Sequence, residues 1–360
     1  MYQRSAKTDG ILLGTILCLT GFGLVILYSM SAYNGQVRFG DTAYYFKKQL
    51  FAVLLGSLIL YAVARLDYHR LERFAAAGYL LSLALSGAVL LFGDTYNGSK
   101  RWLSLGPLSF QPSEFAKPAV ILLLASAVCR LQKRKNGVLG AAVILLVLPI
   151  VGLVGTNNLS TAVIILGIAV IMIFVSNPRY LPFIWIVLAG SGFLGIFLSL
   201  ESYRLERVAI WLHPEQYEKG YQTMQGLYAI GSGGLFGRGL GNSLQKLGFV
   251  PEAQNDMIFS VLCEELGLAG AWFLILLFLI LLWRLMVTAV HAADLFGALI
   301  ASGILGHIAI QVVLNIAVVT NTIPNTGITL PFVSYGGTSV LFLLAEMGLA
   351  LSVGRYSEKI

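Results

Sequence analysis

Residues 257–284 read MIFSVLCEELGLAGAWFLILLFLILLWR, a nearly unbroken apolar run that limits the kinds of fold open to this chain. A helix needs about 20 apolar residues to cross a hydrocarbon core of about 30 Å, whereas membrane barrels use alternating segments of about 10. The run is long and unalternated, so it predicts a membrane-spanning helix. Directly before it stands FVPEAQND, residues 249–256. Its last residue, Asp256, is an acid at the mouth of a spanning segment and therefore a functional-site candidate.

The composition of the whole chain agrees with a membrane location. Of the 360 residues, 57% are hydrophobic and 11% are charged, and the mean hydropathy is +0.81. Soluble domains have roughly 25% charged residues, so we expect an integral membrane protein. The net charge of +7 is attributed to membrane topology and anionic lipids, not to nucleic-acid binding. Cys18, Cys129 and Cys263 lack disulfide or metal-site spacing and are expected to pack as small hydrophobes.

Ten apolar segments predict an all-α polytopic membrane protein with about ten transmembrane helices in a single domain, residues 1–360. The first segment is too long for a cleavable signal and is expected to remain as an anchor. The connection between the seventh and eighth segments, residues 201–256, is much the longest. The expected spans are residues 10–30, 46–64, 74–92, 114–130, 138–155, 160–176, 181–200, 257–284, 295–319 and 335–354.

The distribution of Lys and Arg predicts which side of the membrane each connection faces. With the N-terminus inside, 13 of the 24 basic residues lie in cytoplasmic segments. Six lie outside once the five in the long connection are set aside, because the rule does not apply to long loops. We therefore expect both termini in the cytoplasm and the 201–256 loop outside the cell.

A first polar island lies between the third and fourth segments. Ser113 can cap the next helix, and Glu114 and Lys117, three residues apart, share a face on which they can pair. One interpretation is a structural ion pair that holds the start of the helix. The other is that Lys117, with Lys100 and Arg101 nearby, binds an anionic head group. The sequence leaves both open.

A second polar island is the long outer loop that ends at Asp256. Six glycines between Gly231 and Gly241 allow close backbone approach and expose amides that suit phosphate oxygens, although such runs are as often turns or close helix packing. Arg238 and Lys246 follow ahead of the acid, so the combination predicts a pyrophosphate site beside a base. Two further basic residues of this loop are candidates for substrate binding: Arg204 and Arg207.

A third polar island opens the last apolar segment. Two prolines and three glycines between residues 321 and 339 forbid a regular helix, so this backbone must line a cavity or be buried by protein. Its hydroxyl groups, including that of Ser334, can bind a sugar or satisfy the interrupted backbone. Both interpretations stand at this point.

The three islands together resemble the SEDS family (shape, elongation, division and sporulation), whose members include RodA, FtsW and SpoVE. Eight separate motifs agree in the family's order over nearly the whole chain, so the match is highly specific. They are KRW (100–102), QPSEFAK (111–117), YRLER (203–207), GYQ (220–222), the glycine-rich run, PExxxD (251–256), EELG (264–267) and LPFVSYGG (330–337).

The resemblance implies a bacterial plasma-membrane enzyme that polymerises lipid II into peptidoglycan, working beside a class B penicillin-binding transpeptidase. The growing strand, held by undecaprenyl pyrophosphate, would be the donor and the 4-hydroxyl of lipid II the acceptor, with inversion from an α- to a β-linkage. Asp256 matches the family's essential aspartate and would act as base, and Glu252 could tune it or take part itself. A pyrophosphate leaving group is compatible with Mg²⁺ or Mn²⁺, but no acidic cluster with ligand spacing requires one.

Two departures from the family pattern stand out. Where Pro-Asp-Leu-Gly-Thr is common, this chain reads Asn157-Asn158-Leu159-Ser160-Thr161, so any role of that acid is lost. Asn255 and Met257 flank the candidate base where Thr and Phe are frequent, changes expected to affect only packing. The shared motifs do not distinguish elongation, division and sporulation members.

Several polar residues inside apolar segments have a simpler structural interpretation. Glu264, Glu265 and Glu346 are expected to form interhelical hydrogen bonds, with Glu264 about 12 Å below Asp256 on a straight helix. His307 is expected to be a packed, hydrogen-bonded histidine and not a metal ligand.

Two other functions compete with the enzyme: a lipid II flippase or transporter, and a non-catalytic scaffold for the transpeptidase. A transporter expects a site at the midplane between paired repeats, whereas these polar residues gather on the outer face. A scaffold needs no acid beside basic residues. By resemblance, a single-span transpeptidase anchor is expected to dock against the eighth and ninth helices while the partner's outer domain reaches the 201–256 loop. Small residues on these helices permit close approach, although packing within the bundle could use them equally. These residues are Gly267, Gly270, Gly297, Gly303 and Gly306.

Overall fold

The computed structural model describes residues 8–96, 99–105, 108–132, 139–176, 208–251 and 253–356, with the isolated positions 184, 188, 190, 192 and 195. Two 3₁₀ turns lie at Pro214–Gln216 and Glu218–Gly220. The helices and strands are α1 (Gly10–Phe39), α2 (Tyr44–Arg65), α3 (His69–Glu72), α4 (Ala75–Phe92), β1 (Asp94–Tyr96), β2 (Ser99–Leu105), β3 (Leu108–Phe110), α5 (Pro112–Gln132), α6 (Leu139–Gly155), α7 (Leu159–Ser176), α10 (Tyr221–Ser232), α11 (Ile258–Val290), α12 (Leu295–Val319) and α13 (Gly337–Gly354).

Nine of the predicted spans coincide with helices, namely α1, α2, α4, α5, α6, α7, α11, α12 and α13. The remaining one, residues 181–200, lies almost wholly outside the described residues, so the count of ten stays a prediction. Seven of the described helices are long and apolar enough to cross a membrane. Helix α1 continues to Phe39, beyond the predicted end at residue 30, and Gly40 ends it in a left-handed conformation with φ 68°.

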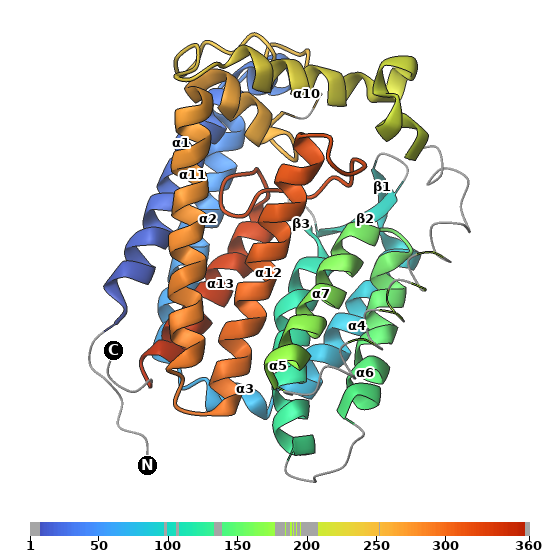
Figure 1. The fold of residues 1–360 in the computed structure, drawn as a ribbon, viewed down its shortest axis with the longest axis vertical. Helices are drawn as coiled ribbons and strands as arrows, with labels where there is room; N and C mark the ends of the chain where they lie inside the picture. The colour runs from blue at the N-terminus through green and yellow to red at the C-terminus, as the bar shows by residue number, and fades with distance from the viewer. Residues whose placement is uncertain are drawn as a thin grey trace.

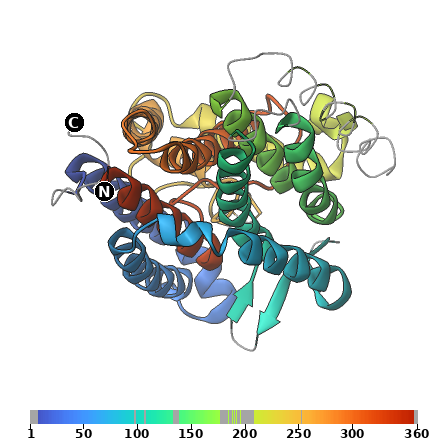
Figure 2. The ribbon, with the colours of Figure 1, turned by 90° about the horizontal axis from the view of Figure 1, so that it is seen from below.

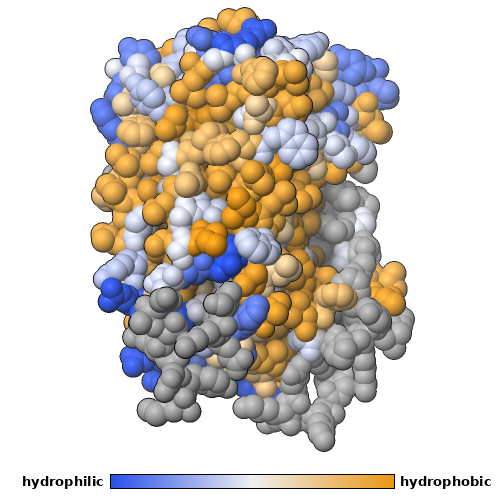
Figure 3. Space-filling view, turned by 60° about the vertical axis from the view of Figure 1, so that its left-hand side comes forward, coloured by the Kyte–Doolittle hydropathy of each residue, from blue (hydrophilic) through white to orange (hydrophobic). Residues whose placement is uncertain are grey.

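The spanning helices form one bundle, seen from the side in Figure 1 and from below in Figure 2. Both chain ends lie at one end of the bundle, whereas α10 and the loops around it lie at the other (Figure 1). Helix α13 packs against α2, and α12 packs against α11, α7 and α5. On the face shown in Figure 3, a broad hydrophobic area lies below a hydrophilic end, as a lipid-facing surface requires.

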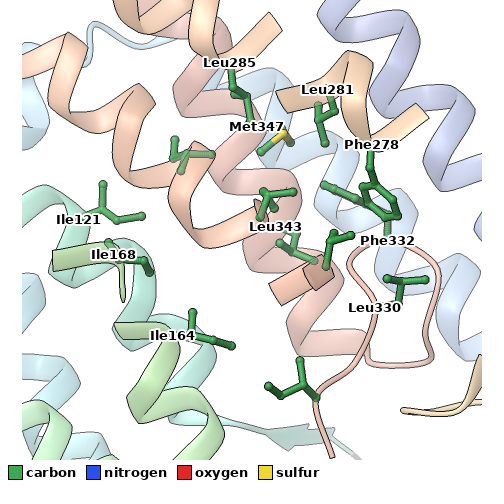
Figure 4. Packing of buried hydrophobic residues seen from close by; sticks show 14 of the residues in the cluster. Ile121, Ile164, Ile168, Phe278, Leu281, Leu285, Leu330, Phe332, Leu343 and Met347 are labelled. Atoms are coloured by element: carbon green, nitrogen blue, oxygen red, sulfur yellow. The ribbon is translucent and has the colours of Figure 1, made fainter. Parts of the chain in front are cut away.

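The hydrophobic core runs through the bundle, with buried residues from α1, α5, α6, α7, α11, α12 and α13, and it includes the loop before α13. Phe332, from the third polar island, is 2% exposed and lies near Phe278 (Figure 4). A side chain on Gly23 of α1 would meet the Phe332 carbonyl oxygen at 2.4 Å, so only glycine allows this approach. The predicted interruption of helix in the third island is confirmed, since residues 320–336 contain no helix.

The first polar island contains a small antiparallel sheet that the all-α prediction missed. Its strand order is β1-β2-β3, with Thr95 opposite Lys100 and Ser104 opposite Ser109. Along Ser99–Leu105 polar and apolar residues partly alternate, a short-period pattern that the search for long apolar runs does not detect. The all-α assignment therefore holds for the spanning part of the described chain and not for this outer connection.

Helix α11 is broken at Gly267, where φ is 64° and ψ is −164°. The glycine-rich run satisfies the broken backbone: the amides of Arg238 and Gly239 donate to the carbonyls of Glu264 and Glu265, both at 2.9 Å. The predicted continuous helix over residues 257–284 is therefore wrong, whereas the 12 Å depth of Glu264 stays a prediction because the break lies beyond that residue. The prediction that these two amides are exposed to a phosphate is also wrong, and the alternative of close helix packing is confirmed.

The glycines of α12 face the interior of the bundle. A side chain on Gly303 would meet Ile121 of α5 at 2.8 Å and Met172 of α7 at 3.0 Å, and one on Gly306 would meet Ile171 at 2.8 Å. The expectation that these two glycines carry a partner interface is wrong, because α5 and α7 already occupy that face. Helix α11, by contrast, exposes a stripe of large apolar residues: Leu268, Trp272, Leu276, Leu279, Trp283, Met286 and Val290.

Candidate functional site

Asp256 lies in the turn before α11 and is half-buried. Its main-chain oxygen accepts a hydrogen bond from Asn315 Nδ2 of α12 at 2.9 Å. Gln222 of α10, part of the GYQ motif, points its side-chain amide at Asp256 Oδ1 from 3.5 Å. The acid is therefore held between α10, α11 and α12 at the end of the bundle that carries α10 and the loops around it.

Arg101 approaches the same point from strand β2. Gly327, with φ 68°, lies beside both side chains: a Cβ atom at this position would lie 3.8 Å from Arg101 Nη1 and 3.8 Å from Asp256 Oδ2. The Arg101 Nε atom donates to the Asn157 carbonyl at 3.0 Å, and this hydrogen bond orients the guanidinium group. Motifs more than 150 positions apart in sequence thus bring a carboxylate and a guanidinium group together over an exposed glycine.

Lys100 lies one residue before Arg101 and takes a different direction. Its ammonium group donates to the Leu90 carbonyl of α4 at 3.4 Å. Lys100 and Arg101 both line a small cavity of about 30 Å³ between α4, the start of α5 and the α6–α7 turn. Ser86 also lines it, and its hydroxyl group has no hydrogen-bond partner among the described residues.

Asn158, which stands where the family pattern has an acid, begins α7. Its Oδ1 atom accepts the Thr161 amide at 3.2 Å, the geometry of an N-terminal helix cap. Asn and Asp cap helices about equally well. The departure from the family pattern therefore preserves the local structure without a negative charge.

The predicted pair of Glu114 and Lys117 is confirmed as an ion pair with an N–O distance of 3.0 Å. Lys117 is 1% exposed and also donates to Gln311 Oε1 at 3.2 Å. His307 continues the network, with Nδ1 2.7 Å from Glu346 and Nε2 2.8 Å from Gln311. These contacts support the structural interpretation of Lys117 and confirm that His307 and Glu346 are interhelical hydrogen-bond partners.

The predicted pyrophosphate site of the long loop is not what the structure shows. Lys246 forms an ion pair with Glu265 at 2.7 Å, donates to Ser29 and is 7% exposed, so its charge is neutralised inside the protein. Arg238 lies 3.6 Å from Glu264 and lines a separate outer cavity of about 440 Å³. Glu264 accepts hydrogen bonds from Ser243 and from the amides of residues 244 and 245.

Ser334 satisfies the interrupted backbone of the third island. Its hydroxyl oxygen accepts the Leu330 amide at 2.8 Å, and its carbonyl accepts Gln49 of α2. At 3% exposure it is buried, which favours the second interpretation of this residue. Glu252, Arg204 and Arg207 lie outside the described residues.

Sequence reasoning did not single out Asn315 or Gln311, and it treated Gly327 only as one of the residues that interrupt the helix. The first two lie four residues apart inside an apolar segment, a spacing that places them on one face of a helix and could have drawn attention to them. In the part of the chain that the structure describes, no group of three or more His, Cys, Asp or Glu side chains is placed to hold a metal ion.

Comparison with known proteins places these features in a family. Fold and site define a polytopic helical membrane protein whose site combines a carboxylate and a guanidinium group at one end of the bundle. The chain belongs to the cell cycle protein family of FtsW, RodA and SpoVE, whose model matches residues 10–359.

The relatives extend over almost the full chain. Stage V sporulation protein E of Bacillus subtilis is 39% identical over 371 residues, covering 99% of this chain and 100% of the relative. The probable peptidoglycan glycosyltransferase FtsW of Trichlorobacter lovleyi is 38% identical, covering 97% of this chain and 94% of the relative.

Solved structures show the same fold. One is a chain of a peptidoglycan synthase complex, solved to show the structural coordination of polymerization and crosslinking. Its TM-score is 0.81 at 32% identity, covering 97% of this chain and 98% of the other. The rod shape determining protein RodA of Thermus thermophilus has a TM-score of 0.74 at 30% identity, with 99% of each chain covered.

Proposed function

We propose that this protein is a peptidoglycan glycosyltransferase that polymerises lipid II at the outer face of the bacterial plasma membrane, with Asp256 as general base. The observation that carries the proposal is the convergence of the Asp256 carboxylate and the Arg101 guanidinium group on Gly327. Relatives named peptidoglycan glycosyltransferase, of similar length and fold, support the reaction class.

In the proposed reaction, Asp256 takes the proton of the acceptor 4-hydroxyl while the oxygen attacks the anomeric carbon of the growing strand. The new C–O bond forms on the face opposite the diphosphate. The old C–O bond breaks and its electron pair leaves with undecaprenyl pyrophosphate, so an α-linked donor becomes a β-linked product. A positioned base contributes about 10²–10⁴-fold in rate.

The leaving diphosphate needs positive charge that is already in place. Arg101 is a cation close to Asp256, whereas Lys100, one residue earlier on the same strand, donates to the Leu90 carbonyl. Lys117 and Lys246 are each paired with a buried glutamate and are not needed for this role. The proposed anion-binding set therefore centres on β2 and not on the glycine-rich run.

The proposal includes a class B penicillin-binding transpeptidase as partner. A related chain comes from a peptidoglycan synthase complex that combines polymerization and crosslinking. The exposed apolar stripe of α11, which includes Trp272 and Trp283, is the surface we assign to the partner's membrane anchor. Cysteine pairs along this stripe and the anchor should crosslink in membranes. Crosslinks found only near α2 and α4 would place the anchor elsewhere.

The reaction is tested by incubating the purified protein with lipid II, with and without its transpeptidase, and separating the products by size. Long glycan strands from this protein establish the polymerase. If the transpeptidase alone forms glycan strands as well as it does with this protein present, the scaffold alternative is established. Movement of lipid II across vesicles without strand formation would establish the transporter.

A further inference from the structure

Helix α12 carries a row of buried polar side chains that the reaction scheme does not use. His307, Gln311 and Asn315 are spaced by four residues and therefore stack along one face of the helix. Their exposed fractions are 1%, 2% and 0%. Polar groups in the interior of a membrane bundle are costly unless they are hydrogen-bonded, so what they bind indicates their purpose.

Asn315, nearest the outer end, joins two main-chain segments that meet at the site. Its Nδ2 group donates to the Asp256 carbonyl at 2.9 Å and to the Ile328 carbonyl at 2.7 Å. A side-chain amide nitrogen has two hydrogens, so one group satisfies both acceptors and its orientation is fixed by them. The Oδ1 atom, on the other side, has no partner among the described residues.

Gln311 holds the next residue of the same loop. Its Nε2 group donates to the Thr329 carbonyl at 3.0 Å, while Oε1 accepts from Lys117. The loop that carries Gly327 is thus attached to α12 at residues 328 and 329. Only the Asn315 attachment also includes Asp256.

We infer that Asn315 is a positioning residue for Asp256, an inference that rests on the proposed function. By joining the Asp256 turn to Ile328, Asn315 sets the distance between the carboxylate and Gly327. The Arg101 guanidinium group also lies beside Gly327. A displacement of about 1 Å at a reacting group can cost about 100-fold in rate. Loss of Asn315 therefore affects the chemical step more than substrate binding.

The test compares Asn315→Leu and Asn315→Ser with Gln49→Leu. Gln49 is a matched control because it is 2% exposed and also bridges main-chain groups of this loop. It donates to the Ser334 carbonyl and accepts the Gly336 amide, and neither bond involves Asp256. Polymerisation rates are measured against lipid II concentration, with melting temperatures of the same preparations. Asn315→Ser is less disruptive to folding than Asn315→Leu and serves as the second variant.

We expect both Asn315 variants to lower kcat by roughly 10–100-fold with KM changed less than about threefold. Gln49→Leu should lower the melting temperature while kcat stays within about threefold. If either Asn315 variant folds and keeps wild-type kcat, or if Gln49→Leu loses as much kcat, the positioning role is overturned. Asp256→Asn measured in parallel separates the claims, because its full activity would overturn the proposed function itself.

Discussion

At the scale of single residues, the ionic partner of each charged group decides whether it is available to a substrate. Lys117 and Lys246 resemble phosphate-binding lysines in sequence, yet each is buried against a glutamate at 3.0 and 2.7 Å. A buried charge without a partner is strongly unfavourable, so such pairs hold the fold together. Arg101, which is half-buried and reaches Gly327, is the basic residue that the structure places with Asp256.

The Glu114–Lys117 pair gives a prediction about stability. Lys117→Met or Glu114→Gln alone leaves the other charge buried, so each should cost about 3–5 kcal/mol of unfolding free energy. The double variant should recover part of that loss, because two neutral side chains need no counter-charge. Thermal unfolding of the three variants in detergent measures the coupling. Lys47→Met, in the exposed pair with Asp41, is the control and should change little. Strictly additive losses would contradict the pairing.

At the scale of elements, the break in α11 joins the membrane bundle to the outer loop. Gly267 has a backbone conformation that glycine adopts readily and other residues rarely adopt. A Cβ atom there would lie 2.3 Å from the Gly237 amide nitrogen. The two halves of α11 and the glycine-rich run therefore depend on one another. The turn that carries Asp256 lies just before the first half.

Substitution of Gly267 should destabilise the packing of the glycine-rich run against α11. Gly267→Ala is expected to cost at least about 1–3 kcal/mol from backbone strain, with further loss from the clash with the loop. Gly21→Ala, in α1 where the Cβ atom meets nothing within 4 Å, should be neutral or stabilising. Melting temperatures and limited proteolysis of the outer loop compare the two. Equal stability of both variants would show that the break is not required.

The opposite end of the bundle predicts a pH dependence. His69 in α3 lies 2.7 Å from Asp67 and 2.8 Å from Asp294, the residue that caps α12. Burial alone would lower the pKa of His69, but the hydrogen bond and charge of each aspartate outweigh it and the net pKa is raised.

A raised histidine pKa stabilises the fold fully below the unfolded value near 6.5, and the contribution is lost as pH rises through the folded value. Melting temperature should therefore fall as pH increases above about 6.5, and His69→Gln should remove that slope. His291→Gln, at an exposed position, is the control and should retain it. A slope unchanged by His69→Gln would contradict the assignment.

At the scale of the whole molecule, the sequence predicts what depends on local pattern. Long apolar runs located α1, α2, α4 to α7 and α11 to α13, and spacing predicted the Glu114–Lys117 pair. The β2 strand was missed because its pattern is short, and the Gly267 break because its cause, the docking of the loop at Gly237, is a distant contact. Asn315 and Gly327 acquire meaning only when segments far apart in sequence meet at Asp256. Motif resemblance singled out Asp256 and the motifs that hold Arg101 and Gln222, but not that they meet beside Gly327.

The central claim is that Asp256 is the base of glycan polymerisation, and one measurement tests it most directly. Purified Asp256→Asn is compared with wild type in polymerisation of lipid II with the transpeptidase present, using Asp41→Asn, an exposed acid of the α1–α2 connection, as the matched control. We predict that Asp256→Asn keeps the wild-type melting temperature and loses about 10²–10⁴-fold in rate, while Asp41→Asn polymerises normally. Glycan strands formed by Asp256→Asn at the wild-type rate would contradict the account.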